Sequence, residues 1–213
     1  IAIKQRFDRM LRVGYTKTEI VDRIEDIQHE LIRESLRKTG ISEGVEITTM
    51  GDIPSAGSGL GSSSTVTVGS LHAMYTYLGS IVPAEQLAAE ACEIEIDILG
   101  KPIGVQDQYI VALGGFRYIE FMPNGNIKSE RVDISPKNLR TLNENLMLFF
   151  TGVTRQADTI LNEHNDNLRI SRNILRRMKE LVHIGRDELI AGNINAIGEL
   201  LHESWILKQQ LAS

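Results

Sequence analysis

Apolar residues recur at helical spacing in the first part of the chain. They begin after Thr18 and are Ile20, Ile24, Ile27 and Leu31. Spacings of four, three and four residues place these side chains on one face of a helix. Thr18 suits the start of such a helix and Gly40 its end. We therefore predict an amphipathic helix between Thr18 and Gly40.

A second helical pattern follows a loop in which glycine and serine dominate. Val45 to Thr49 reads as a short strand, and residues 55–64 form the loop. From about Ser62 apolar residues return at helical spacing, and they are Val66, Leu71, Met74, Tyr75 and Leu78. The loop is therefore expected to join a strand to a helix.

Pro83 opens a third helical pattern, which Gly100-Lys101-Pro102 ends. Its apolar face consists of Leu87, Ala91, Ile94 and Ile98. Glu93 falls on the opposite, solvated face, whereas Glu95 falls at the margin of the apolar stripe. A carboxylate there is costly unless a cation or a hydrogen-bond donor meets it.

The rest of the chain mixes strands and helices. Three strands are expected, at Gly115–Phe121, Ile127–Val132 and Leu146–Phe150, and a Pro-Asn-Gly turn at 123–125 makes the first two a hairpin. From Arg155 the pattern is helical, with the clearest stretches at Leu168–Val182 and Ile194–Leu207 and breaks near Gly185 and Gly192. Trp205 shares a helical face with Ile194, Ile197 and Leu201, which predicts a core position. Strands and helices without strict alternation indicate an α+β fold.

Composition excludes several classes of protein. The 213 residues carry a net charge of −5 without a basic cluster, which argues against a nucleic-acid partner. No apolar run reaches the roughly 18 residues of a membrane span, so we expect a soluble protein. The single cysteine, Cys92, makes no internal disulfide and favours a buried thiol in a reducing cytoplasm. The chain starts at Ile1 without methionine and stops inside a helical pattern, which leads us to expect a fragment.

The glycine-rich loop has the features of an anion site. The first N–H groups of a helix lack partners within the helix, and glycine lets the backbone approach phosphate oxygens closely. No Gly-Lys-Ser/Thr is present, so the loop is not a Walker P-loop, and the glycine spacing does not fit a dinucleotide fingerprint. Hydroxyls suit both phosphate and Mg²⁺. A flexible loop with a serine helix cap remains the alternative.

Two motifs resemble those of the GHMP kinases, the superfamily of galactokinase, homoserine kinase and mevalonate kinase. Residues 54–64, Pro-Ser-Ala-Gly-Ser-Gly-Leu-Gly-Ser-Ser-Ser, are similar to the second signature of that family. Here four residues separate the proline from Gly-Leu, as in the branch that phosphorylates heptose 7-phosphate, whereas most members have three. Residues 100–109, Gly-Lys-Pro-Ile-Gly-Val-Gln-Asp-Gln-Tyr, resemble the segment that carries the catalytic aspartate in galactokinase-like sugar kinases.

The resemblance implies a role for individual residues. Asp107 is the expected catalytic base, and Ser63 with Glu95 is the expected Mg²⁺ pair. The ATP phosphates are expected at Pro54, Ser55, Gly57, Ser58, Gly59, Leu60, Gly61, Ser62, Ser63 and Ser64. The acceptor substrate is expected near Gly104, Gln106, Thr154 and Arg155. The alternatives are a helix cap for Asp107, a surface salt bridge for Glu95 and a helix start for Thr154 and Arg155. His72 is expected to be a packed or surface side chain.

The resemblance also implies the domain organisation. It predicts a GHMP fold with two-layer sheets and packed helices, divided into an ATP-binding domain over 1–151 and the start of a helical domain over 152–213. The family's basic residue near the catalytic aspartate and its third, glycine-rich signature are absent from this chain, so both domains are expected to be incomplete.

The function implied is an ATP-dependent kinase that phosphorylates a hydroxyl of a sugar or sugar phosphate, with heptose 7-phosphate as the first candidate. Alternatives are a related protein that binds nucleotide or sugar without turnover, a kinase for mevalonate or homoserine, and a purely structural domain. The sequence leaves the oligomeric state open.

Overall fold

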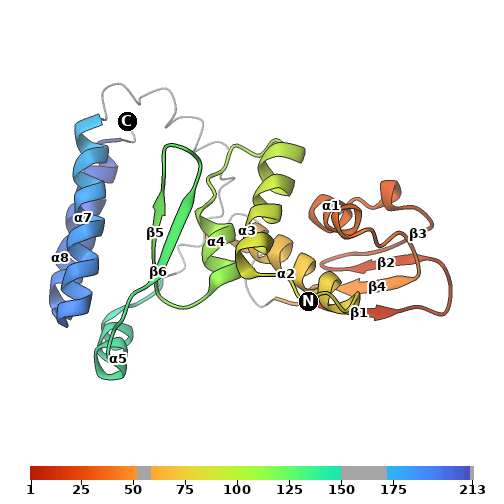
Figure 1. The fold of residues 1–213 in the computed structure, drawn as a ribbon, viewed down its shortest axis with the longest axis horizontal. Coiled ribbons are helices and arrows are strands. Elements are labelled where there is room, and N and C mark those ends of the chain that lie inside the picture. The colour runs from red at the N-terminus through yellow and green to blue at the C-terminus, as the bar shows by residue number, and fades with distance from the viewer. Residues whose placement is uncertain (52–58, 150–171, 212–213) are drawn as a thin grey trace. The chain divides into compact units, whose positions relative to one another are not determined.

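The structure is a computed structural model that describes residues 1–51, 59–149 and 172–211 (Figure 1). These residues divide into two compact units, of which the first ends at Gly114 and the second begins at Gly115. The boundary between ATP-binding and helical domains that the sequence predicts at residue 151 differs from this division into compact units and stays a prediction.

The first unit contains a four-stranded sheet with the order β1-β4-β2-β3. The strands are β1 (Ala2–Gln5), β2 (Leu11–Gly14), β3 (Thr18–Val21) and β4 (Val45–Thr48). β2 and β4 are parallel, with Leu11 opposite Val45 and Val13 opposite Ile47, and the other pairs are antiparallel. These four side chains are almost completely buried and form one apolar face of the sheet.

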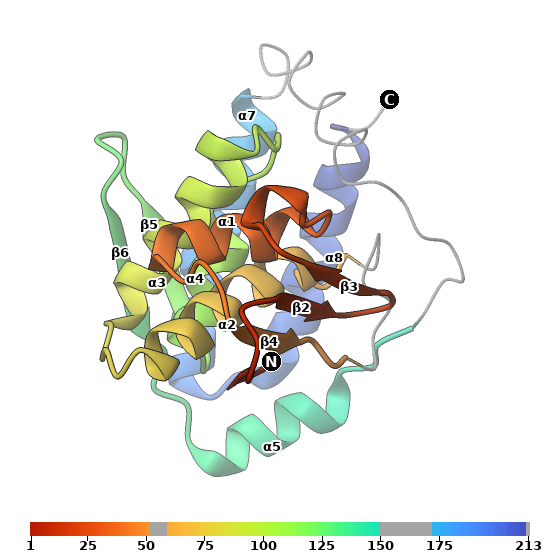
Figure 2. The same ribbon diagram turned by 90° about the vertical axis from the view of Figure 1, so that its right-hand side faces the viewer.

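Two helices cover that face (Figure 2). α1 (Glu30–Thr39) contributes Ile32 and Leu36 to the sheet's core, and α2 (Ser62–Tyr77) contributes Met74. The strand and the helix expected on either side of the glycine-rich loop are thus confirmed as β4 and α2, while residues 52–58 lie outside the described residues and 62–64 belong to α2.

The helix predicted between Thr18 and Gly40 is wrong in its first half. Thr18–Val21 is strand β3, Ile24–Asp26 is the short 3-10 helix η1, and α1 starts only at Glu30. Ile20 lies opposite Arg12 in the sheet and is 54% exposed, so it belongs to no helical face. Pairing with β2 overrides a helical spacing that only the second half of the segment uses. The end is confirmed, because Gly40 has a left-handed φ of 76° directly after α1.

Three further helical segments complete the first unit. α3 (Ala84–Cys92) begins after Pro83, as predicted, and continues into a π-helical turn, η2 (Glu93–Ile98). The Leu99 N–H donates to the Ile94 carbonyl at 3.0 Å, the i to i+5 bond of a π-helix. α4 (Gln106–Leu113) packs against α2 and α3. The shared core consists of Val68, Leu71, Leu87, Ala91 and Ile94, with Val111 and Ala112 against it.

The second unit contains a two-stranded hairpin and three described helices. β5 (Arg117–Phe121) and β6 (Ile127–Arg131) are antiparallel, and Gly125 has a φ of 82° in the turn, which confirms the predicted hairpin. The helices are α5 (Pro136–Asn145), α7 (Arg172–Ala191) and α8 (Ile194–Gln209). α5 was not predicted.

Three expectations for the second unit are wrong. Residues 146–149 form no strand and expose large apolar side chains, while Phe150 lies outside the described residues. α7 runs through Gly185 without a break, although Gly192 does separate it from α8. Trp205 is 57% exposed, and Leu201 on the same helical face is 54% exposed, so this part of α8 does not lie in the core. The mixture of helices and small sheets nevertheless confirms the α+β class.

Candidate functional site

The described part of the glycine-rich loop makes a tight turn into α2. Gly59 and Gly61 have φ angles of 70° and 67°, and Gly61 is the residue that precedes the first turn of the helix. The side chain of position 61 caps nothing, since glycine has none. No side chain at position 61 therefore covers the N-terminal, positive end of the α2 dipole. Four predicted phosphate-binding residues, Pro54, Ser55, Gly57 and Ser58, lie outside the described residues.

The structure brings Asp107 to this turn. A Cβ built on Gly61 would lie 3.2 Å from Asp107 Oδ2 and 3.4 Å from its carboxyl carbon. Asp107 is exposed and stands in the first turn of α4. The N-cap of that helix is Val105, so Asp107 does not hold the capping position that the alternative interpretation required.

Ser63 and Glu95 also lie together. The Ser63 hydroxyl donates to Glu95 Oε2 at 2.8 Å. Glu95 is 0% exposed, and its other oxygen, Oε1, has no hydrogen-bond partner within the described residues. Complete burial excludes the surface salt bridge considered for Glu95. Glu93, by contrast, is exposed and pairs with Lys38 at 2.6 Å, which confirms it as a solvated residue.

The Ser63–Glu95 pair fits a magnesium ion. A buried carboxylate with only one neutral donor is unfavourable unless a cation meets its charge. Mg²⁺ takes hard oxygen ligands and usually keeps several waters or phosphate oxygens beside one or two carboxylates. Within residues 1–51, 59–149 and 172–211 there is no cluster of three or more His, Cys, Asp or Glu side chains that could hold a metal. The pair therefore suits an ion that arrives with phosphate oxygens rather than one caged by the protein.

The turn that carries Glu95 was not predicted. The apolar spacing from Pro83 to Ile98 suggests a continuous α-helix, whereas residues 93–98 widen into the π-helical turn η2. Such turns often occur at functional sites. In the apolar pattern itself, the one sign of an irregular turn was the position of Glu95 at the margin of the apolar stripe.

Two polar residues of this region were also missed. Gln108, next to Asp107, is 0% exposed, and neither its amide nitrogen nor its amide oxygen has a partner among the described residues. Ser70 on α2 is equally buried, and its hydroxyl is likewise unpaired there. A polar residue on the same face of α4 as Val111 and Ala112 could have signalled Gln108.

The expected acceptor residues are only partly described. Gly104 and Gln106 are both exposed just before and at the start of α4, while Thr154 and Arg155 lie outside the described residues. His72 is exposed, as expected for a surface side chain. Their roles toward a substrate stay predictions.

The thiol of Cys92 lies directly before the π-helical turn. It is half-buried, and burial raises its pKa to about 11, with the nearby charges of Glu95 and Asp97 adding to the shift. A thiol with this pKa is protonated at neutral pH and is a poor metal ligand. Cys92 is less deeply buried than the sequence suggested.

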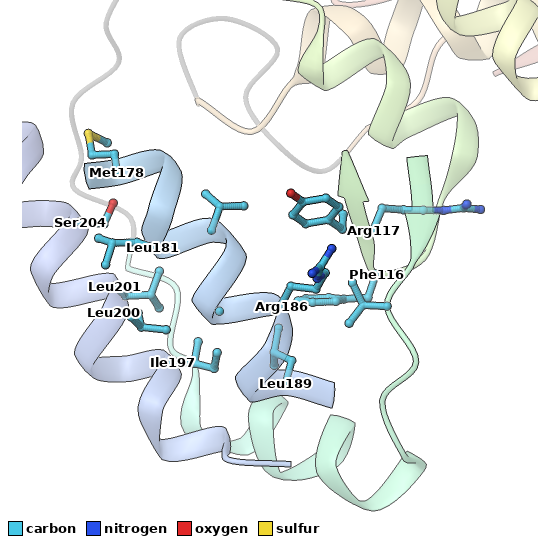
Figure 3. Close-up of a pocket in the computed structure, with 14 residues that line it drawn as sticks. Phe116, Arg117, Met178, Leu181, Arg186, Leu189, Ile197, Leu200, Leu201 and Ser204 are labelled. Carbon is cyan, nitrogen blue, oxygen red and sulfur yellow. The ribbon is translucent and has the colours of Figure 1, made fainter. Parts of the chain in front are cut away.

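A separate pocket of about 270 Å³ lies within the second unit, between the β5–β6 hairpin, α7 and α8 (Figure 3). Its walls are mainly apolar, and they include Phe116, Leu181, Leu189 and Leu200. Arg186 crosses this wall, with its Cζ 4.7 Å from the centre of the Tyr118 ring and its guanidinium 3.3 Å from Glu130. None of the predicted site residues that the structure describes lines this pocket.

No helix in the described ranges combines the length and the apolar composition that a membrane crossing requires.

Comparison with known proteins identifies kinases. One relative is the D-glycero-alpha-D-manno-heptose 7-phosphate kinase of Campylobacter jejuni. The two sequences are 28% identical over 196 residues, which are 89% of this chain and 55% of the relative. The mevalonate kinase of Thermococcus onnurineus is 35% identical over 91 residues, which are 43% of this chain and 26% of that protein. The chain thus spans about half the length of the Campylobacter protein.

A solved structure shares the fold. The D-glycero-D-manno-heptose 1-phosphate kinase of Bacteroides thetaiotaomicron superposes with a TM-score of 0.83 at 24% identity, and the match covers 99% of this chain and 67% of that one. The family model for the GHMP kinases N terminal domain matches residues 24–115. This stretch contains the glycine-rich loop, Glu95 and Asp107. Residues 24–115 of the chain therefore match the GHMP kinases N terminal domain, and the chain shares the α+β fold of that solved kinase.

Proposed function

We propose that the protein is an ATP-dependent kinase that transfers a phosphoryl group to a hydroxyl of a sugar or sugar phosphate, and that its acceptor is a heptose phosphate, with heptose 7-phosphate as the first candidate. The observation that carries the proposal is the contact between Asp107 and Gly61. It brings a carboxylate to the N-terminal end of α2, where a glycine turn can receive phosphate.

The phosphates of ATP bind at the glycine-rich loop and the first turn of α2. Backbone N–H groups and the helix dipole favour negative charge at this point, and glycine leaves room for the phosphate oxygens. Ser62 and Ser63 on the same turn are half-buried and add hydroxyl groups beside the phosphates, whereas Ser64 is 2% exposed and contributes through its backbone.

Ser63 and Glu95 hold the magnesium ion. When bound, the ion neutralises charge on the β- and γ-phosphates. The buried carboxylate of Glu95, which has one unpaired oxygen, is the anionic ligand, and Ser63 contributes a hydroxyl oxygen.

Asp107 acts on the acceptor hydroxyl. It accepts the hydroxyl proton at its carboxylate while the acceptor oxygen forms a bond to the γ-phosphorus, and the bond from that phosphorus to the bridging oxygen of ADP breaks. Asp107 on α4 is exposed beside the N-terminal end of α2, which leaves space for a substrate next to its carboxylate. Gly104 and Gln106, exposed on the same approach to α4, contact the acceptor.

A sugar acceptor is favoured over mevalonate by the extent of the matches. The likeness to the heptose 7-phosphate kinase covers 89% of this chain, whereas the likeness to the mevalonate kinase covers 43%. Likeness that extends into the second unit supports the sugar branch, because acceptor selection needs residues beyond the shared phosphate site.

The test is an acceptor screen on the full-length protein. ADP release is measured with ATP and Mg²⁺ against heptose 7-phosphate, heptose 1-phosphate, free hexoses and mevalonate. Turnover with a heptose phosphate well above the others supports the proposal. ATP binding without ADP release for any acceptor would instead identify a binding protein, and turnover with mevalonate alone would identify the other branch.

A further inference from the structure

Four buried polar atoms around α2 lack hydrogen-bond partners among the described residues. They are Ser70 Oγ, Glu95 Oε1, Gln108 Oε1 and Gln108 Nε2. The three residues that carry them are each 0% exposed. The great majority of buried polar groups in proteins have a hydrogen-bond partner, so four unpaired atoms in one region call for a physical reason.

The three residues come from α2, η2 and α4, and α2 packs against each of the other two segments. Ser70 lies on α2 two turns after Ser63, Glu95 lies on η2 and bonds Ser63, and Gln108 lies on α4 next to Asp107. α4 packs against α2, and Ile94, the neighbour of Glu95, shares an apolar core with Val111, which is one turn after Gln108. Ser70 and Gln108 therefore lie on helices that pack together beside the proposed magnesium pair.

The unpaired atoms are chemically complementary. An amide nitrogen donates, an amide oxygen accepts, a carboxylate oxygen accepts and a hydroxyl can donate. These atoms do not bond one another in the structure. One chain of bonds, formed when a metal is bound, would satisfy all four of them: Ser70 Oγ–H would donate to Gln108 Oε1, and Gln108 Nε2–H would donate to Glu95 Oε1.

We propose that Gln108 is a positioning residue for the metal carboxylate, and that Ser70 orients Gln108 in turn. The inference rests on the proposed function. Among the residues that the structure describes, the Glu95 carboxylate has a single donor, the Ser63 hydroxyl. Once the Ser63 oxygen and Glu95 Oε2 both turn to a cation, the carboxylate needs another donor to keep its orientation. The Gln108 amide is the buried donor available on the neighbouring helix.

The proposed role predicts that loss of these side chains weakens metal binding without lowering the stability of the metal-free protein. Removing an unpaired buried polar group for an apolar group of similar shape is neutral or stabilising, whereas removing a paired one is destabilising. Gln108→Met and Ser70→Ala should therefore leave the unfolding temperature in EDTA unchanged or raised. Both should weaken metal binding, since residues that orient a metal ligand typically contribute about 10- to 100-fold in affinity.

The experiment uses the full-length protein and two readouts. Thermal unfolding is measured in EDTA without nucleotide, and Mn²⁺ affinity is measured by electron paramagnetic resonance with a non-hydrolysable ATP analogue. We expect the Mn²⁺ dissociation constant to rise about 10- to 100-fold in Gln108→Met and by less in Ser70→Ala. In a Glu95→Gln background, Gln108→Met should add little further loss. Ser129→Ala is the matched control, because Ser129 on β6 also has a buried, unpaired hydroxyl but belongs to the second unit.

The outcomes separate the two proposals. Normal Mn²⁺ affinity in Gln108→Met, with normal binding by the wild type, overturns the role of Gln108 and leaves the kinase proposal intact. A lower unfolding temperature in EDTA with unchanged Mn²⁺ affinity makes Gln108 a purely structural residue. If the wild type binds no Mn²⁺ with the ATP analogue, the proposed function fails, and this inference fails with it.

Discussion

The carboxylate of Asp107 lies directly against the backbone of Gly61. A Cβ at position 61 would lie 3.2 Å from Asp107 Oδ2, closer than side chains normally pack, and the φ of 67° at Gly61 already disfavours any other residue. The glycine thus serves two purposes, since it allows the turn into α2 and admits the aspartate.

Gly61→Ala should impair both the fold and the site. The left-handed φ costs about 1–2 kcal/mol for a residue with a Cβ, and the added methyl displaces Asp107 as well. Gly79→Ala is the matched control, because Gly79 has a φ of 74° with nothing within 4 Å of its built Cβ. Chemical denaturation should show a similar loss of stability for both variants, whereas only Gly61→Ala should lower kcat. Equal kcat values for the two variants would contradict the importance of the contact.

Asp107→Asn should lower kcat by about 10²-fold or more, because the amide keeps the shape of the carboxylate but cannot accept the hydroxyl proton. Nucleotide affinity should change little, since Asp107 is assigned to the acceptor. Steady-state kinetics and nucleotide titration of the full-length protein test both expectations. Asp97→Asn, an exposed aspartate on η2, serves as the control. Near-normal kcat in Asp107→Asn would make Asp107 a structural residue of the loop.

Glu95→Gln should separate stability from metal use. It removes a buried charge while keeping an oxygen that can accept from Ser63, so the unfolding temperature in EDTA should not fall. The Mg²⁺ concentration for half-maximal activity should rise at least tenfold, because the only carboxylate of the pair is lost. Glu93→Gln loses just its exposed ion pair with Lys38, worth about 0–1 kcal/mol, and should keep the Mg²⁺ dependence of the wild type. Identical Mg²⁺ curves for both variants would remove Glu95 from the metal site.

Cys92 should react slowly with alkylating reagents. With a pKa of about 11 instead of 9.0, its thiolate fraction at pH 8 is about 100-fold lower than that of an ordinary cysteine. The rate should rise about tenfold per pH unit until the pH approaches 11. Glu95→Gln removes a negative charge that disfavours the thiolate, so the pKa should fall and the rate should increase. Iodoacetamide labelling followed by mass spectrometry measures both effects, and fast labelling of the wild type at pH 7 would contradict the shift.

The elements that the sequence predicted well are those with local signals. Gly61 before α2, Pro83 before α3 and Gly40 after α1 act through their own backbone preferences, so their positions could be predicted without knowing the fold. The strand β3 could not, because Ile20 is placed by its pairing with Arg12 on β2 rather than by its neighbours in sequence. The apolar run at 146–149 has the composition of a strand but pairs with none of the described strands.

The site divides in the same way. Motif resemblance selected Ser63, Glu95 and Asp107, and the structure brings Ser63 to Glu95 and Asp107 to the loop. No motif marks Gln108, and its one signal, a polar residue on the helical face of Val111 and Ala112, is weak because a glutamine beside an aspartate reads as part of the same polar turn. Its burial follows only from the packing of α4 on two other helices, which is a property of the folded chain.

The geometry of the π-helical turn at Glu93–Ile98 depends on the exact number of residues in it. A bond from Leu99 back to Ile94 encloses one residue more than an α-helical turn would. Loss of one residue from this turn would let the backbone close as an ordinary α-helix and redirect the side chains around it by about 100° per residue, since 3.6 residues make a turn. A one-residue deletion between Glu93 and Ile98 would thus turn the Glu95 carboxylate away from Ser63 without altering either side chain, so the number of residues in this turn is itself part of the site.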